Sequence, residues 1–218
     1  MPNWITNKIA APPHVIRAML DDGLRVDFDR IAPFPGPHGA EWDSINLYAE
    51  RAAKDVCGVP LSDVPVIAAL ERANRERINV RDMTDDVFEQ FVAMVRNWRA
   101  CGYLHPMDHA KRMWGTKWNA VRSWGAPNEG RCEFETAWAC PRGVLVLLSE
   151  RCPEDEIEVT YADEDIGSNC GTFTLRAGQV IAQDIAPRRS DLDDAGRARW
   201  KAFAYAVTGR RPEEAEEP

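Results

Sequence analysis

The segment from Trp114 to Asn119 brings two tryptophans, a glycine and a lysine together within six residues. A lysine beside aromatic rings can form a cation–π contact, and exposed rings can stack on a single-stranded nucleic acid. Lys117 and Asn119 are therefore candidate partner-binding residues. The alternative is structural: the two tryptophans anchor a neighbouring segment to the core, which predicts that Trp118 is largely buried.

A second group of polar residues, Asp163, Glu164 and Asp165, follows a predicted strand, with Asn169 nearby. Clustered oxygen ligands at a strand end can hold Mg²⁺ or Ca²⁺. The spacing is not that of an EF-hand, because no glycine-centred loop of twelve residues ends in a glutamate here. A solvated acidic turn is the simpler interpretation. We therefore expect no metal and no cofactor, and keep the three carboxylates only as weak candidates.

The sequence contains no known catalytic signature, and we predict no catalytic residue. His105 and His109 lie four residues apart, but Pro106 separates them and no H-E-x-x-H motif is present. The six cysteines form no C-x-x-C pair, so buried thiols in a reducing cytoplasm are expected. Neither a signal peptide nor an apolar run of membrane-spanning length is apparent. These features favour a non-catalytic, cytoplasmic protein.

Alternating apolar and polar residues predict strands at residues 3–10, 24–32, 132–139 and 156–162. In the last three, the apolar side chains share one face and the acidic side chains point to the other. Trp138 falls on the apolar face and is predicted to be buried. Exposed carboxylates can simply keep strands soluble, but together they can also form a docking face. The predicted acidic face consists of Asp27, Asp29, Glu133, Glu135, Glu156 and Glu158.

The order of the predicted elements indicates an α+β fold. Residues 1–40 and 114–187 give strands and helices in the β-α-β-β-α-β order of a ferredoxin-like antiparallel sheet. Helical periodicity in residues 41–113 predicts a large helical insertion. A C-terminal helix is expected within residues 188–209. The charged residues 210–218 are expected to be disordered.

Short pieces of the chain also carry a resemblance. Pro2-Asn3-Trp4 with Asn7, then Trp114–Asn119, residues 134–138 and residues 158–165 occur in an order that resembles the YubB-type family of plasmid and phage proteins. That family has a ferredoxin-like domain and no established activity, so the resemblance implies the fold and not a reaction. Its context implies an accessory role on a mobile genetic element, such as countering a host defence system.

The net charge of −8 is confined to one part of the chain, because residues 132–187 hold three arginines against eleven acidic residues. Such a local excess creates a directed field and disfavours phosphate contacts. We therefore predict binding, through the acidic sheet face, to a basic protein surface such as that of a host nucleic-acid-binding protein, without direct nucleic-acid or membrane contact. The alternatives are a metal-dependent enzyme that uses Asp163, Glu164 and Asp165, and a single-stranded nucleic-acid-binding domain.

Overall fold

The computed structural model describes residues 2–39, 42 and 44–211. These residues form two compact units. The second unit is Phe34–His109, and the first consists of the described residues on either side of it. The helical insertion predicted at 41–113 therefore differs from the compact unit by a few residues at each end. No helix in the described part of the chain is long and apolar enough to cross a membrane.

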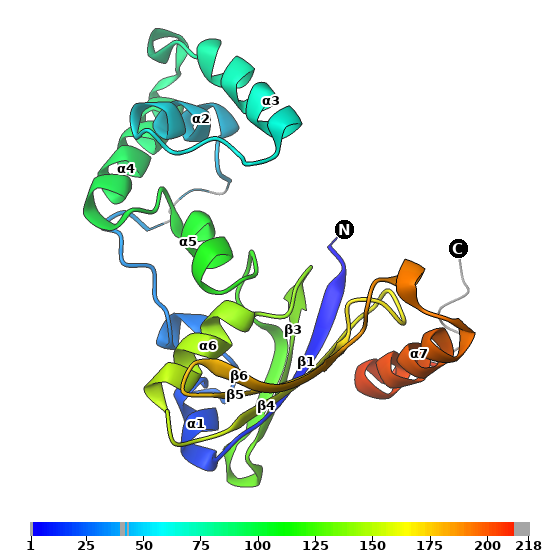
Figure 1. The fold of residues 1–218 in the computed structure, drawn as a ribbon. Helices are drawn as coiled ribbons and strands as arrows, with labels where there is room; N and C mark the ends of the chain where they lie inside the picture. The colour runs from blue at the N-terminus through cyan, green and yellow to red at the C-terminus, as the bar shows by residue number, and fades with distance from the viewer. Residues whose placement is uncertain (1, 40–41, 43, 212–218) are drawn as a thin grey trace. The chain divides into compact units, whose positions relative to one another are not determined.

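A six-stranded antiparallel sheet forms the centre of the first unit, in the order β2-β3-β1-β4-β5-β6 (Figure 1). Together with α1 (Pro13–Ala18) and α6 (Arg142–Arg151), the first four strands give the β-α-β-β-α-β order predicted from the sequence. The α+β, ferredoxin-like fold class is thus confirmed, and a hairpin extends its β4 edge. The strands are β1 (Trp4–Ala10), β2 (Val121–Ala126), β3 (Arg131–Ala137), β4 (Ile157–Asp163), β5 (Gly171–Arg176) and β6 (Gln179–Ile185).

The two faces of the sheet have different coverings. In β1, Ile5 and Ile9 point into the main core, which α1 and α6 close on one face of the sheet. Helix α7 (Asp194–Thr208) packs on the opposite face, where Trp200 contacts the cluster around Ala162 of β4. The remainder of that second face is not covered by α7, and we call it the open face. Its residues are Thr6, Lys8, Ala10, Trp124, Glu133, Glu135, Glu158 and Thr160.

The strand predicted at residues 24–32 is wrong. The segment contributes an isolated bridge through Val26 and then a 3-10 turn, η1 (Phe28–Arg30). Asp27 caps this turn by accepting a hydrogen bond from the backbone N–H of Asp29. The apolar residues of this segment, such as Val26 and Phe28, are buried in the core, although the segment does not form a strand of the sheet. Asp27 and Asp29 consequently do not lie on the open face.

The second strand of the ferredoxin-like core is instead β2, which the sequence patterns did not predict. It pairs with β3 through a short turn, η3 (Pro127–Glu129). The ladder is irregular between Val121 and Trp124, and the two exposed side chains of this edge strand are those of Arg122 and Trp124. The helical unit is therefore inserted between α1 and β2.

The second unit is built from α2 (Leu47–Val56), α3 (Pro65–Glu76) and α4 (Asp85–Cys101), with a short turn, η2 (Val80–Asp82), before α4. Helix α5 (Pro106–Met113) starts in this unit and ends in the first. A small core joins α2 to α4. Its fully buried members are Ala49, Ala53, Met94 and Leu104.

An ionic contact in this unit gives a pH-dependent prediction. His105 and then Lys54 hold the pKa of Glu50 at about 2, with His105 Nε2 at 3.8 Å and Lys54 Nζ at 2.7 Å from Glu50 Oε1. Because this folded-state pKa lies below the unfolded value of about 4.3, the stabilisation is complete above about pH 4.5 and is lost toward pH 2. Glu50→Gln should lower the free energy of unfolding by about 1–2 kcal/mol at pH 7, allowing for partial solvent screening.

The measurement is chemical denaturation of the variant and of the parent protein between pH 7 and pH 2. The exposed Glu76, near the end of α3, provides a matched control as Glu76→Gln. The free energies of unfolding of the two variants should differ at pH 7, and this difference should disappear as the pH falls toward 2. Equal stabilities at pH 7 would show that Glu50 is not held by this contact.

Candidate functional site

The segment Trp114–Asn119 divides into a buried half and an exposed half. Trp114 is 6% exposed, and its indole Nε1–H donates a hydrogen bond to the carbonyl of Ala32 at 2.9 Å. The buried hydroxyl of Thr116 donates to the carbonyl of Ala137 at 3.0 Å. These two residues fasten the segment to the core and to the end of β3. They supply the anchoring role that was expected of both tryptophans.

Asn119 is also part of the fold. Its side-chain carbonyl accepts a hydrogen bond from the backbone N–H of Phe28 at 2.9 Å, and its amide donates to Asp27 at 2.7 Å. The side chain therefore holds the irregular segment that was mistaken for a strand. These contacts occupy both polar groups of Asn119. This residue, which was predicted to bind a partner, therefore has a structural role.

Trp118 and Trp138, by contrast, are exposed, and the prediction that they are buried is wrong. Their side chains are 39% and 46% exposed, and their ring centroids lie 5.2 Å apart. Strict alternation would place Trp138 on the covered face with Phe134. Its backbone instead adopts a left-handed conformation with φ of 63°, just past the end of β3, which breaks the alternation and turns the indole outward.

Two cations and a third indole complete this group. The Lys117 Nζ lies 4.8 Å from the ring centroid of Trp118 and 5.4 Å from that of Trp138. Trp4, at the start of β1, lies 6.3 Å from Trp118, and the guanidinium of Arg122 lies 5.6 Å from the ring of Trp4. We call this group the tryptophan cluster. Its members are Trp4, Lys117, Trp118, Arg122 and Trp138.

Two of the five non-glycine residues that have a positive φ in the described part of the chain lie in the tryptophan cluster. Arg122 has φ of 45° and Trp138 has φ of 63°, in the left-handed region that side chains other than glycine rarely adopt. Such residues cost about 1 kcal/mol or more each and are frequent at functional sites. Both strained residues project exposed side chains into the tryptophan cluster. The strain is thus associated with presenting these side chains to solvent.

Three of the four glutamates of the predicted acidic face are paired with cations. The three pairs are Glu133 with Lys8 at 3.8 Å, Glu135 with Arg122 at 2.6 Å, and Glu156 with Arg176 at 3.9 Å. Lys8 and Arg122 come from outside residues 132–187, whereas Arg176 lies within that segment. The open face therefore has mixed charge, and the uniformly acidic face expected from composition does not form.

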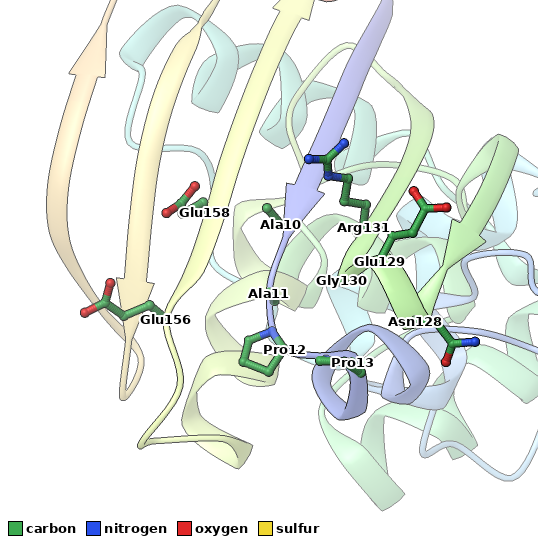
Figure 2. A pocket seen from close by; sticks show the side chains of 10 residues that line it. All are labelled: Ala10, Ala11, Pro12, Pro13, Asn128, Glu129, Gly130, Arg131, Glu156 and Glu158. Atoms are coloured by element: carbon green, nitrogen blue, oxygen red, sulfur yellow. The ribbon is translucent and has the colours of Figure 1, made fainter.

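An acidic groove remains at the end of the open face where β1 stops (Figure 2). Its volume is about 570 Å³, and the small side chain of Ala10 forms its floor between Glu158 and Arg131. Glu156 and Glu129 also line it, so three carboxylates face one arginine. Among the described residues, neither Glu158 nor Glu129 has an ion-pair partner. The groove contains Glu156 and Glu158 of the predicted acidic face, together with Glu129, which was not predicted, and it retains an excess of negative charge.

The three weak metal candidates use their oxygens within the fold. Asp163 accepts hydrogen bonds from the amide of Asn169 at 3.0 Å and from the backbone N–H of Asp165 at 2.9 Å. Glu164 pairs with Arg210 at 2.7 Å. Asp165 accepts from the hydroxyl of a neighbouring serine. The carboxylates are therefore directed at different donors and do not converge on one point.

Buried thiols offer no nucleophile. Burial raises the pKa of Cys132 and of Cys140 to about 12, and that of Cys170 to about 11. A thiol must be deprotonated to attack a substrate, and these groups remain protonated at neutral pH. The exposed aromatic and charged groups of the open face, rather than these cysteines, form the candidate site.

The match to a protein-family model agrees with this architecture. Residues 113–200 match a family model described as the ferredoxin-like domain in Api92-like protein. No curated protein matches the chain. A solved structure, that of protein api92 from Yersinia pseudotuberculosis, is 10% identical and aligns with a TM-score of 0.37 over 86% of this chain and 99% of that chain. By the family match, residues 113–200 of this chain are a ferredoxin-like domain similar to that of Api92-like proteins.

Proposed function

We propose that this protein is a non-catalytic binding protein and that a partner protein docks on the open face of its sheet. The observation that supports this most directly is the tryptophan cluster. Tryptophan and arginine are the residues that most often dominate the binding energy of protein interfaces. Here Trp118 and Trp138 of the cluster are 39% and 46% exposed, and Trp124 of the open face is 49% exposed.

The charges on this face define the chemistry of the partner. A hollow of about 200 Å³ beside Trp138 is bordered by Lys111 and Lys117 and by no carboxylate. The acidic groove lies at the opposite end of β1, seven residues long, and therefore about 20 Å away. A partner that covers both ends would bury an area of ordinary size for a protein interface. We propose a partner with a basic patch that enters the groove and an apolar patch that covers the indoles.

Binding of a single-stranded nucleic acid is the second candidate, because stacked, exposed indoles beside Lys117 could also hold bases. A strand bound there would need a basic path for its phosphates. The open face leads instead from the tryptophan cluster to Glu158, Glu156 and Glu129. This charge pattern favours a protein partner.

Site-specific photo-crosslinking tests the proposal. A photoreactive residue replaces Trp124, which is 49% exposed on the open face, and in a second sample replaces Val66, which is 79% exposed on α3. After irradiation in host extract, the Trp124 sample should yield one defined protein adduct that the Val66 sample lacks. Adducts to nucleic acid, or the same adduct from both positions, would reject this face as a protein-docking site.

The acidic groove gives a kinetic prediction. Changing Glu129, Glu156 and Glu158 together to glutamine should slow association with the crosslinked partner about tenfold at low salt, because steering by a complementary field is lost. Glu154→Gln is the matched control, since Glu154 shares Arg176 with Glu156 but does not line the groove. Association rates across ionic strengths provide the measurement. An unchanged rate and salt dependence in the triple variant would exclude a basic patch at the groove.

The wider biological role rests on the YubB-type resemblance. We propose that the partner is a protein of a bacterial host and that binding serves a plasmid or phage, as in the inhibition of a defence or nucleic-acid-handling protein. A basic nucleic-acid-binding surface has the charge that the acidic groove complements. The identity of the crosslinked protein decides this point directly.

A further inference from the structure

Three potential metal ligands meet on the first unit, where His14 follows Pro13 and Asp155 precedes Glu156 of the acidic groove. His14, Cys152 and Asp155 each offer one ligand atom, and these atoms all lie within 4.8 Å of one another. His14 belongs to α1, whereas Cys152 is the residue that ends α6. The backbone N–H of Asp155 donates to the carbonyl of Cys152 at 3.1 Å, so a single turn presents both side chains.

We propose that His14, Cys152 and Asp155 form a Zn²⁺ site that links α1 to the turn after α6. An imidazole nitrogen, a thiolate sulfur and a carboxylate oxygen are the ligand types that Zn²⁺ takes in proteins. Three protein ligands leave the fourth tetrahedral position for water. Magnesium and calcium select oxygen ligands, and the thiol and imidazole therefore disfavour them.

The ligand atoms lie within 4.8 Å of one another, so tetrahedral coordination of zinc requires adjustment of the side chains. Bond lengths of 2.0–2.3 Å place neighbouring ligand atoms about 3.3–3.6 Å apart. The Nε2 of His14 and the Oδ2 of Asp155 are now 2.8 Å apart, in hydrogen-bond contact, and need to separate by a few tenths of an ångström. The His14 side chain is 63% exposed and can make this adjustment without disturbing the core.

The electrostatic surroundings agree with a bound cation. The carboxylate of Asp155 places negative charge beside the Cys152 thiol. The guanidinium of Arg151 is directed at the carbonyls of Arg30 and Ile31 instead of the thiol. The C-terminal end of α6 adds partial negative charge, which favours a cation there. When zinc binds, the Sγ–zinc bond forms as the thiol proton passes to solvent, so affinity should fall with decreasing pH.

Metal titration of the full-length protein tests the site. After treatment with a chelator, the protein should bind one Zn²⁺ per chain in competition with a chromophoric chelator, and its melting temperature should rise. With Co²⁺ as the probe, a thiolate-to-cobalt charge-transfer band should appear. Cys152→Ser, His14→Ala and Asp155→Asn should each weaken zinc binding at least about tenfold. Because His14 is exposed, His14→Ala should fold normally.

Cys57→Ser is the matched control, since Cys57 is another partly buried free cysteine but belongs to the second unit. This variant should retain the cobalt band that Cys152→Ser loses. The proposal is overturned if no stoichiometric zinc binds, if zinc binding survives all three site variants, or if Cys57→Ser abolishes it. The test does not depend on the partner protein, so its result and that of the crosslinking experiment are independent.

Discussion

Trp118→Ala and Trp138→Ala should each weaken binding of the partner protein by about 2 kcal/mol or more, roughly thirtyfold in Kd, because truncating an interface tryptophan removes a dominant contact. The same changes should lower the free energy of unfolding by only about 1 kcal/mol, since the rings are 39% and 46% exposed. Calorimetric titration with the partner measures the first effect. Thermal melting of the isolated protein measures the second.

Trp114→Ala is the control within the same segment. Trp114 is buried and bonded to Ala32, so its loss should destabilise the fold while leaving the affinity of the folded molecules unchanged. If Trp118→Ala instead lowered the melting temperature as much as Trp114→Ala and left affinity intact, both tryptophans would be structural anchors. The proposed binding role of the tryptophan cluster would then be wrong.

Phe28→Ala should have the largest effect on stability, about 3–5 kcal/mol. Phe28 has no exposed surface, and its ring centroid lies 5.6 Å from those of both Trp114 and Phe134, in edge-on contact. Removing the ring opens a cavity at the meeting point of the irregular segment, the anchored segment and β3. The melting temperature of the first unit should fall by about 10 °C.

Urea denaturation followed by circular dichroism tests this prediction, with Phe28→Leu as the milder comparison. Leucine retains much of the apolar volume and should cost about 1–2 kcal/mol. A loss below 1 kcal/mol for Phe28→Ala would show that the residue is peripheral to the core. Such a result would also mean that the hydrogen bond from the backbone N–H of Phe28 to Asn119 does not hold a core residue in place.

The sequence predicted the strands that have regular alternation and failed where burial was irregular. Strands β1, β3 and β4 were recognised because their apolar residues recur at every second position. Residues 24–32 show the same period, yet the backbone N–H groups of Phe28 and Asp29 bond to the side chains of Asn119 and Asp27 instead of to a strand. The spacing of apolar residues in a sequence indicates which side chains are buried. Whether the segment forms a strand depends on whether its backbone groups hydrogen-bond to another strand.

The exposed part of the candidate site could not be predicted for two physical reasons. A left-handed backbone at Trp138 reverses the face that its strand parity assigns, and no local pattern specifies that conformation. Trp124 and Arg122 lie on β2, whose bulge hides the alternation. A signal was nonetheless present, because Asn128 and Gly130 mark the turn of the β2–β3 hairpin.

The charge of the open face was predicted only in part. Residues 132–187 do contain an excess of acidic residues over basic ones. Lys8 and Arg122, which neutralise Glu133 and Glu135, come from strands outside that segment and reach the carboxylates only through the sheet register. A local count of charges cannot include partners that tertiary structure supplies.

The most direct test of the central claim is the ¹⁵N spectrum of the tryptophan indoles, recorded with and without the crosslinked partner. Each indole N–H gives a separate signal that reports its own surroundings. If the partner docks on the open face, the signals of Trp4, Trp118, Trp124 and Trp138 should shift on binding, while those of the buried Trp114 and Trp200 stay in place. Binding that shifts only the signals of Trp42 and Trp98, in the second unit, would contradict the account.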